Sequence, residues 1–293
     1  MLVFDYSPAY KNLNKKIGQA NHFVITLLIG LDAIILHNSQ KPEEFRTTWN
    51  PKDKKASVVR SRDFALKSSL AWAIDSLDRY LIDCNHNFSI TTEPESRLFS
   101  EDKNNLDDKI DSIYRKIHST IDDEKFEIFA AMIYLAALWK EKLVHPSTTN
   151  SPLTKYTYIL KTNRNVINAD FCGLDILRTI ESFQSNNDPT MKEVTSFIRS
   201  ICGFSKILDN FAFNSELKLT KYATHVLHRY FDEHLKQKQL FPTLTEDKQI
   251  KKLTTLLINN GFREVEGHSD FFKLSNTFFQ DYLTTYFKKI EIA

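Results

Sequence analysis

Residues that break regular secondary structure are scarce in this sequence. Its 293 residues include only 6 Gly and 8 Pro, too few for a many-turned all-β protein, so long helices are favoured. The three cysteines, Cys84, Cys172 and Cys202, are odd in number, widely separated and outside any CxxC pair. This usage argues against a disulfide framework and against a structural zinc site, and it fits a reducing cytoplasm best.

An excess of one charge is also missing. The chain has 39 Lys+Arg and 37 Asp+Glu, a formal net charge of +2, so no global field draws it to nucleic acid or to a membrane, and any RNA site must be local. Walker, GxGxxG, GxSxG and Cys-His nucleophile patterns are absent as well. Their absence lowers the expectation of nucleotide hydrolysis, hydride transfer and ordinary hydrolase chemistry.

Membrane and export signals are not evident in the sequence. The N-terminus lacks the basic region, short apolar core and cleavage site of a signal peptide. The longest apolar run, Phe23 to Leu36, is interrupted by Thr26, Gly30 and Asp32 and is shorter than the ~20 residues that cross a bilayer. We therefore expect a buried helix there, no membrane partner and a cytoplasmic protein.

Apolar residues recur at three- and four-residue steps through most of the chain, which predicts an all-α fold. The expected helices cover about 10–37, 58–84, 102–119, the segment from 120–124 to Pro146, 153–160, 170–183, 190–201, 216–239, 245–259 and 275–288. The polar segments 38–57 and 85–101 contain proline and are expected to be connections.

A stretch rich in Asn and Ser, Gln184 to Pro189, is the best candidate for a domain boundary. It predicts a helical bundle over 1–187 and a smaller helical C-terminal domain over 188–293. Within the second domain, Phe262 to Leu274 carries Gly267 between short β-friendly pieces and predicts a hairpin. Helices around a hairpin would give a winged-helix-like arrangement.

One helix end brings together residues that could do chemistry. Lys140 precedes His145 by five positions, and Pro146 stops the helix. A histidine can take a proton from an RNA 2′-hydroxyl or return one to the leaving oxygen, while a cation stabilises the charge that grows on the phosphate. The alternative is that Lys140, Lys142 and His145 merely complement the helix dipole, which stabilises a helix by ~0.3–1 kcal/mol for each residue.

The segment Leu138-Trp139-Lys140-Glu141-Lys142-Leu143-Val144-His145-Pro146, following two other long helices, resembles the HEPN superfamily of helical bundles. The signature of that superfamily is an arginine, four to six residues and a histidine. Many members are metal-independent endoribonucleases that work as dimers, and others are noncatalytic. The resemblance covers roughly 1–184, so it makes 1–187 a HEPN-like bundle and leaves the C-terminal domain unexplained.

The resemblance implies an endoribonuclease of a bacterial toxin or antiphage defence system. It would be a homodimer that acts on RNA without metal or cofactor, with His145 as acid and base and Lys140 as electrostatic stabiliser. The pattern departs from the family at Lys140, because lysine cannot make the bidentate guanidinium fork to phosphate, and at Glu141, which adds a negative charge. The alternative function is a noncatalytic all-helical scaffold that binds RNA or protein.

Three further groups are weaker candidates. Arg60 and Arg62 open the second long helix, and in a bundle they could line the same groove as His145 and, with Lys142, bind phosphate. The alternative is that they are loop residues paired with Asp63 or another acidic neighbour. His225, His228 and Asp232 share one side of a helix, but without an HExxH pattern a solvated face is favoured over a metal site. The aromatic residues from Phe271 to Phe287 have mostly helical spacing, so they are expected to be part of the hydrophobic core. The alternative is that they stack on bases or bind a protein partner of the C-terminal domain.

Overall fold

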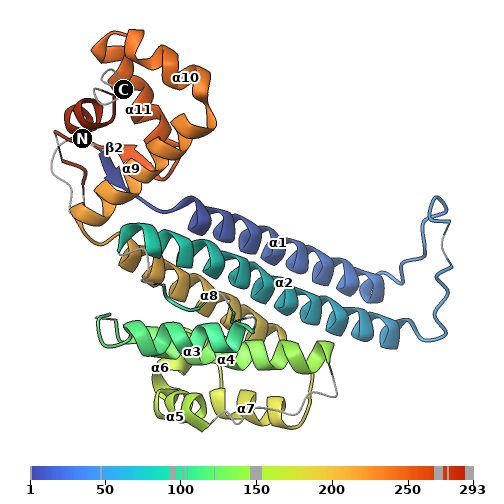
Figure 1. Ribbon diagram of the computed structural model, residues 1–293. Helices are drawn as coiled ribbons and strands as arrows, with labels where there is room; N and C mark the ends of the chain where they lie inside the picture. Colours follow the sequence, from blue (N-terminus) through green and yellow to red (C-terminus); the bar gives the residue numbers. More distant parts are fainter. Residues whose placement is uncertain are drawn as a thin grey trace. The chain divides into compact units, whose positions relative to one another are not determined.

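The computed structural model describes residues 2–46, 48–92, 97–100, 102–103, 105–121, 123–145, 154–266, 273–275 and 277–287 (Figure 1). The fold is all-α, as the sequence predicts, and the only sheet among these residues has two short strands. Pro146, Phe271 and Phe272 lie outside the described residues.

The elements follow one another along the chain as helices of very different length. They are β1 (Leu2–Phe4), α1 (Pro8–Leu36), α2 (Lys54–Thr91), α3 (Leu106–Ile117), α4 (Lys125–Val144), α5 (Thr154–Thr162), α6 (Arg164–Asp170), α7 (Ile176–Gln184), α8 (Met191–Ala212), α9 (Glu216–Glu233), α10 (Leu235–Leu240), η1 (Phe241–Thr243), α11 (Glu246–Ile258), β2 (Phe262–Glu264), α12 (Phe278–Tyr282) and the π-helix η2 (Leu283–Phe287).

The chain forms two compact units, and each is built from segments distant in sequence. Unit 1 contains 1–12, 80–100 and 206–293, and unit 2 contains 13–79 and 101–205. Three of the four limits of the units therefore fall inside helices, namely α1, α2 and α8, and the fourth lies between α2 and α3. This grouping differs from the division at 187/188 expected from the sequence, since residues 191–205 of α8 belong to unit 2 and residues 206–212 to unit 1.

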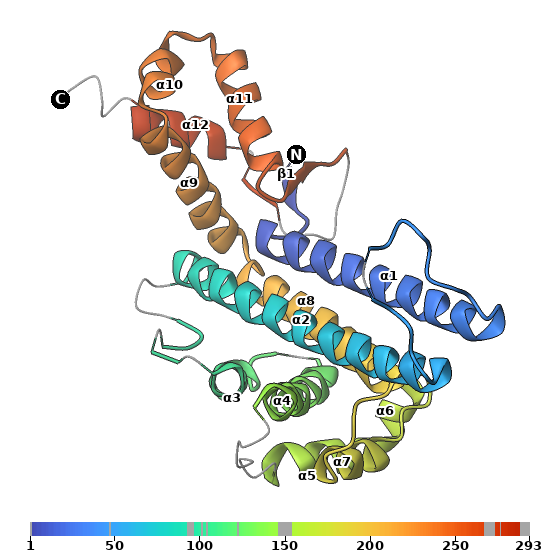
Figure 2. The same ribbon diagram turned by 90° about the vertical axis from the view of Figure 1, so that its right-hand side faces the viewer.

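Unit 2 is built around α4. The residues of α4 from Phe126 to Trp139 are mostly buried on every side of the helix, and both views show α4 between α2 and the short helices α5 and α7 (Figures 1 and 2). A helix that is apolar all round belongs in a core. Gly203 on α8 lets that helix approach α4, because a side chain there would collide with the ring of Phe129.

Local sequence signals fix several helix starts. Thr190 and Glu193 form a reciprocal capping box at α8, in which the Thr190 N–H donates to the Glu193 carboxylate over 2.7 Å. Asp175 accepts hydrogen bonds from the N–H groups of Leu177 and Arg178 at the start of α7. These caps satisfy backbone donors that would otherwise lack partners.

Unit 1 is held together by aromatic side chains around the short sheet. β1 pairs antiparallel with β2, with Val3 opposite Arg263. The ring of Phe4 lies 4.2 Å from that of Phe213 and 5.2 Å from that of Phe262, measured between centroids. The aromatic residues near the C-terminus are partly core as well, since Phe278, Tyr282 and Phe287 are buried.

Several expectations from the sequence are corrected. Residues 85–91 continue α2 instead of forming a connection, because the buried side chain of Asn85 binds the backbone of Leu98 and Phe99. β2 pairs with the N-terminal strand β1, where Val3 also bridges to Lys273, and residues 267–272 of the expected hairpin lie outside the described residues. The expected helix over 170–183 is interrupted before α7, where Cys172 and Gly173 have positive φ.

The segment Phe23–Leu36 is helical as expected, but most of it is not buried. Leu13, Ile17, Val24 and Leu28 are buried, but Phe23, Leu27 and Ile29 are 60%, 55% and 64% exposed. Of the helices that the structure describes, α1 alone is long and apolar enough to cross a membrane by length and composition, a test that core helices of soluble proteins and signal sequences also pass.

Candidate functional site

The last turn of α4 is where the core helix emerges and where the suggested motif lies. Trp139 is 1% exposed, and its indole N–H donates to the carbonyl of Asn187 over 3.2 Å. The residues after Trp139 become progressively accessible, and His145 caps the helix with an exposed side chain. The backbone N–H of His145 donates to the Glu141 carbonyl over 2.7 Å.

Lys140 forms ion pairs with two carboxylates. Its Nζ lies 3.5 Å from Asp75 Oδ1 on α2 and 3.3 Å from Glu141 Oε1, and its side chain is 23% exposed. Partial burial alone would lower the pKa of Lys140, but the Asp75 and Glu141 carboxylates outweigh it and leave that pKa above its ordinary value. Lys140 is therefore a charged lysine whose charge is already balanced.

A further acidic side chain, Asp107, lies near this ion pair. Burial is the main cause of the raised pKa of Asp107 at the start of α3, and the charges of Asp108 and Glu141 raise it further. Glu141 thus interacts with Asp107 on one side and with Lys140 on the other. A phosphate approaching Lys140 would meet this negative field, which opposes binding of an anion.

Lys142 faces a different part of unit 2. Its Nζ donates to the carbonyl of Phe183 over 2.9 Å and to Asn186 Oδ1 over 3.0 Å, and lies 4.0 Å from the centroid of the Phe183 ring. Desolvation lowers the pKa of Lys142. The ammonium thus satisfies carbonyl groups at the C-terminal end of α7, and it is directed away from Lys140.

The two arginines lie far from the last turn of α4. Arg62 pairs with Asp32 of α1, and Arg60 is exposed. Because a helix rises 1.5 Å per residue, the thirteen positions between Arg62 and Asp75 on α2 correspond to ~20 Å. The structure therefore brings Lys140 and Asp75 together and leaves Arg60 and Arg62 at a separate place.

The histidines of α9 have contacts that do not require a metal. The His228 ring stacks on Tyr286 at 4.4 Å between centroids, and the His225 ring lies 6.0 Å from that of His86. Asp232 accepts hydrogen bonds from Lys238 over 2.9 Å and from the Tyr286 hydroxyl over 3.2 Å. Within the described ranges no three His, Cys, Asp or Glu side chains converge as a metal site would require.

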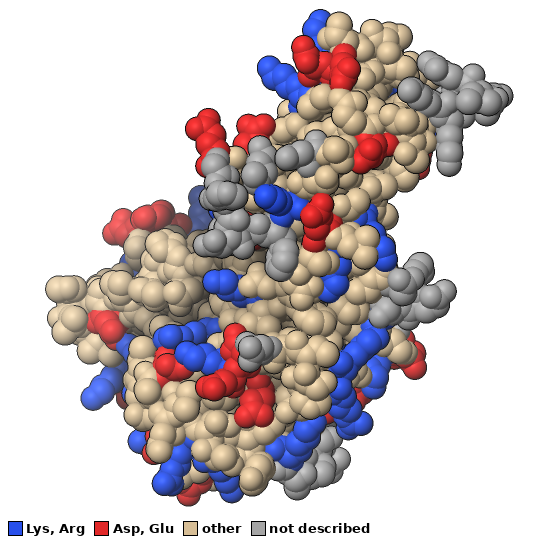
Figure 3. Space-filling view, turned by 90° about the vertical axis from the view of Figure 1, so that its left-hand side faces the viewer, with Lys and Arg blue, Asp and Glu red and all other residues tan. Residues whose placement is uncertain are grey.

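Figure 3 shows Lys and Arg next to Asp and Glu over much of one face of the molecule, and a run of Lys and Arg along the lower right edge of that face. The net charge of the whole chain is only +2. Electrostatic recognition of nucleic acid uses a patch or stripe of positive charge. Lys140, Lys142, Arg60 and Arg62 do not form such a patch, because they lie apart and Lys140 and Arg62 are paired with carboxylates.

An apolar groove between α1 and α2 is the feature that the motif-based reasoning did not find. It has a volume of about 600 Å³ and is lined by Phe23, Leu27, Phe64 and Trp72 among others. Phe64 is 72% exposed and Trp72 is 55% exposed. The sequence does contain a signal for it, because large apolar residues stand next to the buried stripe of both helices, Phe23 beside Val24 and Phe64 beside Ala65. A helix that buries a single face needs no apolar residues there.

No family model, no curated protein and no solved structure matches this chain.

Proposed function

We propose that the chain is a noncatalytic helical scaffold that acts through protein contact, and that it first binds a second copy of itself through the α1–α2 groove. The exposed aromatic side chains of that groove carry the proposal. Monomeric proteins rarely expose contiguous apolar patches without a binding role. The balanced charge of Lys140 supports the noncatalytic half of the proposal, because a neutralised cation stabilises a phosphate poorly.

The area of the patch suits a homodimer. Phe23, Phe64 and Trp72 are 60%, 72% and 55% exposed, and at ~200 Å² for each aromatic side chain they present ~370 Å² per copy. Two copies would therefore bury ~750 Å² from these rings alone, and Leu27 with the polar rim would bring the total near the ~1,000 Å² expected of a specific interface.

The shape and the polar rim favour a second copy over a lipid surface. The rings of Phe64 and Trp72 line the groove and are 72% and 55% exposed, so a two-fold axis through the groove would place the same apolar rings of two copies against each other. Ser61, Ser68 and Gln19 line the same groove. Hydroxyl and amide groups keep hydrogen-bond partners in a protein interface with bridging water but lose them in hydrocarbon.

Light scattering during gel filtration tests the dimer. We expect the wild-type chain to be a dimer and Phe64→Glu to be a monomer, because a charge at the centre of an apolar interface costs about 2 kcal/mol or more, a loss of ~30-fold in affinity. Tyr158→Glu is the matched control, since Tyr158 on α5 is 71% exposed outside the groove. A monomeric wild type, or a Phe64→Glu dimer as tight as the wild type, would refute the proposal.

A cysteine introduced in the lining of the groove tests whether the groove is the interface. In a background with Cys172→Ser, which removes an exposed thiol, Ser68→Cys is expected to form an intermolecular disulfide under mild oxidation. Residues near a two-fold axis lie opposite their own copies. Binding to vesicles of phosphatidylcholine instead, with no cross-link, would assign the groove to lipid.

Metal-independent RNA cleavage is the second candidate function, and the exposed position of His145 five residues after Lys140 favours it. If the acidic neighbours suppress catalysis, Asp75→Asn should raise cleavage of RNA in EDTA, and His145→Ala should abolish it. Lys142→Met controls for loss of an adjacent cation. Equal and negligible cleavage by all of these variants would leave the scaffold function alone.

A further inference from the structure

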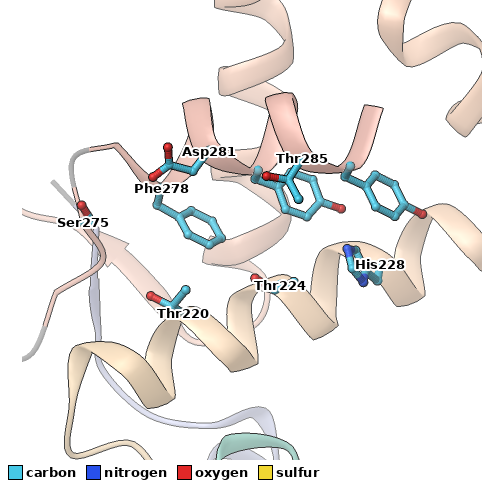
Figure 4. Close-up of a pocket in the computed structure, with 9 residues that line it drawn as sticks. Thr220, Thr224, His228, Ser275, Phe278, Asp281 and Thr285 are labelled. Carbon is cyan, nitrogen blue, oxygen red and sulfur yellow. The ribbon is translucent and has the colours of Figure 1, made fainter. Parts of the chain in front are cut away.

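The aromatic side chains of unit 1 cover one another. Figure 4 shows His228 of α9 directed toward the helical segment of α12 and η2, and its ring stacks on that of Tyr286 at 4.4 Å between centroids. The Tyr282 ring lies 5.3 Å from the Tyr286 ring, and Lys238 Nζ lies 5.0 Å from the Tyr286 centroid. These rings have partners within unit 1, whereas the apolar side chains at one end of unit 2 face solvent.

That end of unit 2 is where α1 ends and α2 begins. Lys54, the first residue of α2, donates through Nζ to Asn38 Oδ1 over 2.8 Å and so holds the two helices together beside the loop between them. Figure 1 shows this loop beyond the end of α4. We call residues 29–62, which include the last two turns of α1, the loop and the start of α2, the α1–α2 tip.

Large apolar side chains of the α1–α2 tip are exposed. Ile29 and Leu36 in the last two turns of α1 are 64% and 77% exposed, and Phe45 in the loop is 58% exposed. Ile35 and Val59 are exposed as well. Only 6% of the most apolar 18-residue window of α1 is buried, whereas the core helix of a soluble protein is mostly buried. These side chains are therefore available to a partner that removes them from water.

The α1–α2 tip is also locally basic. It contains seven Lys or Arg and four Asp or Glu, and one of each, Arg62 and Asp32, pair with one another. Four of the other cations are exposed, namely Arg46, Lys52, Lys55 and Arg60. The local excess of three positive charges is larger than the +2 of the whole chain. The expectation of no membrane partner rested on that whole-chain charge and on the length of the apolar run, and neither describes this local surface.

The combination of aliphatic and basic side chains fits a lipid surface better than RNA. RNA would meet the cations and could stack a base on Phe45, but it would leave Ile29 and Leu36 in water. Interfacial protein segments place apolar side chains at the boundary of headgroups and acyl chains, and their Lys and Arg attract anionic lipids. Half-buried Trp49 lies in the same loop, and tryptophan is enriched at membrane–water interfaces.

We propose that the α1–α2 tip binds the surface of a bilayer that contains anionic lipid, with Leu36 and Phe45 entering the boundary of headgroups and acyl chains and with Lys52 and Lys55 meeting lipid phosphates. The contact is peripheral, since Leu28, two turns before the end of α1, is buried within the chain. None of the exposed apolar side chains named for the tip is among the described residues that line the α1–α2 groove. Lipid binding here is therefore independent of the proposed dimer.

Flotation of the full chain with vesicles tests the apolar contact. Wild type should bind vesicles of phosphatidylcholine and phosphatidylglycerol in equal parts, and should bind phosphatidylcholine alone at least ~10-fold more weakly, because each Lys or Arg near an anionic surface adds to the attraction. Leu36→Gln with Phe45→Gln should weaken binding to the mixed vesicles ~10-fold or more. Tyr158→Gln with Leu217→Gln, at side chains 71% and 66% exposed on α5 and α9, is the matched control and should bind like wild type.

A second pair of variants tests the charges. Lys52→Gln with Lys55→Gln should weaken binding to the mixed vesicles ~10-fold and leave binding to phosphatidylcholine unchanged. Lys236→Gln with Lys248→Gln removes two exposed charges from α10 and α11 and should bind like wild type. RNA retardation that is lost in the Lys52 and Lys55 variant, without binding of wild type to vesicles, would assign the basic residues to RNA and overturn the proposal.

Tryptophan fluorescence locates the contact. Brominated acyl chains in the mixed vesicles should quench emission of wild type, and much less that of Trp49→Phe. Because Trp72 lines the groove, quenching that persists in Trp49→Phe and disappears in Trp72→Phe would place the lipid in the groove and overturn the proposal.

Thermal melting separates lost binding from misfolding. Leu36→Gln with Phe45→Gln should melt like wild type, because both side chains are exposed. Absence of wild-type binding to the mixed vesicles, or equal binding by wild type and this variant, would overturn the proposal.

Discussion

The buried carboxylate of Asp209 should make the stability of this protein depend on pH in an unusual direction. Asp209 lies on α8, is 5% exposed and accepts the Ser7 N–H over 2.8 Å and the Ser7 hydroxyl. Ser7 in turn accepts the Tyr10 N–H over 3.1 Å and so begins α1. Burial raises the pKa of Asp209 to about 6, although the two hydrogen bonds from Ser7 lower it.

The sign follows from comparing the folded and unfolded states. The folded pKa of about 6 lies above the ordinary value of 3.8, so the folded protein binds the proton more tightly. Its free energy of unfolding therefore falls as pH rises from about 4 to about 6 and is constant above that range. A difference of about two pKa units corresponds to about 3 kcal/mol. Tyr80, Cys84 and Tyr222 interact electrostatically with this carboxylate, and none of the three carries a positive charge that would offset the cost.

Asp209→Asn isolates this effect, because an amide resembles the protonated acid in shape and charge. Urea unfolding followed by circular dichroism at pH 4 and pH 7.5 should give similar stabilities for variant and wild type at the lower pH. At pH 7.5 the variant should be more stable by up to about 3 kcal/mol. Ser7→Ala, which removes one donor, should steepen the pH dependence instead. A stability difference between Asp209→Asn and wild type that does not change with pH would contradict the reasoning.

Two substitutions test the geometry elsewhere. Gly261→Ala should destabilise the chain by about 2 kcal/mol or more in a thermal melt. Gly261 has φ +102°, and a Cβ at this position would collide with the Tyr6 carbonyl oxygen. An unchanged melting temperature would refute this close approach. Lys142→Met keeps the alkyl chain but removes the hydrogen-bond donor to Phe183 and Asn186. Thermal melting should show that the free energy of unfolding falls by about 1–3 kcal/mol. An unaltered melting temperature would mean that this contact does not stabilise the end of α7.

Helix positions were predictable where apolar periodicity is strong, and unpredictable where tertiary contacts decide. The apolar periodicity predicted both α1 and α2. It did not predict that α2 continues past residue 84 to Thr91, where the Asn85 side chain binds the backbone of Leu98 and Phe99. The strand character of β2 was predictable from its local sequence, but its pairing with β1 was not, since that partner is at the other end of the chain. A pairing between strands so far apart in the sequence cannot be recognised from a short stretch of residues.

Exposure was also underdetermined. Val24 is in the core, whereas Phe23 and Leu27, which belong to the same apolar run, are 60% and 55% exposed. The sequence cannot distinguish these cases, because it does not show whether another helix covers an apolar residue beside the buried stripe. Composition therefore predicted a core helix, whereas only the arrangement of α1 beside α2 reveals an uncovered face (Figures 1 and 2).

The chemistry around Lys140 shows why a short motif is an incomplete description of a site. The five-residue spacing from Lys140 to His145 is a property of α4 alone, but the electrostatic state of Lys140 is set by Asp75 from α2 together with Glu141, and Asp107 from α3 adds to the acidity. Three segments therefore determine whether the lysine can serve a phosphate. Because a unit charge at ~4 Å has an interaction energy of ~1–4 kcal/mol near a protein surface, one acidic neighbour can cancel what the motif supplies. The removal of Asp75 is thus a more informative test of ribonuclease activity than the removal of Lys140.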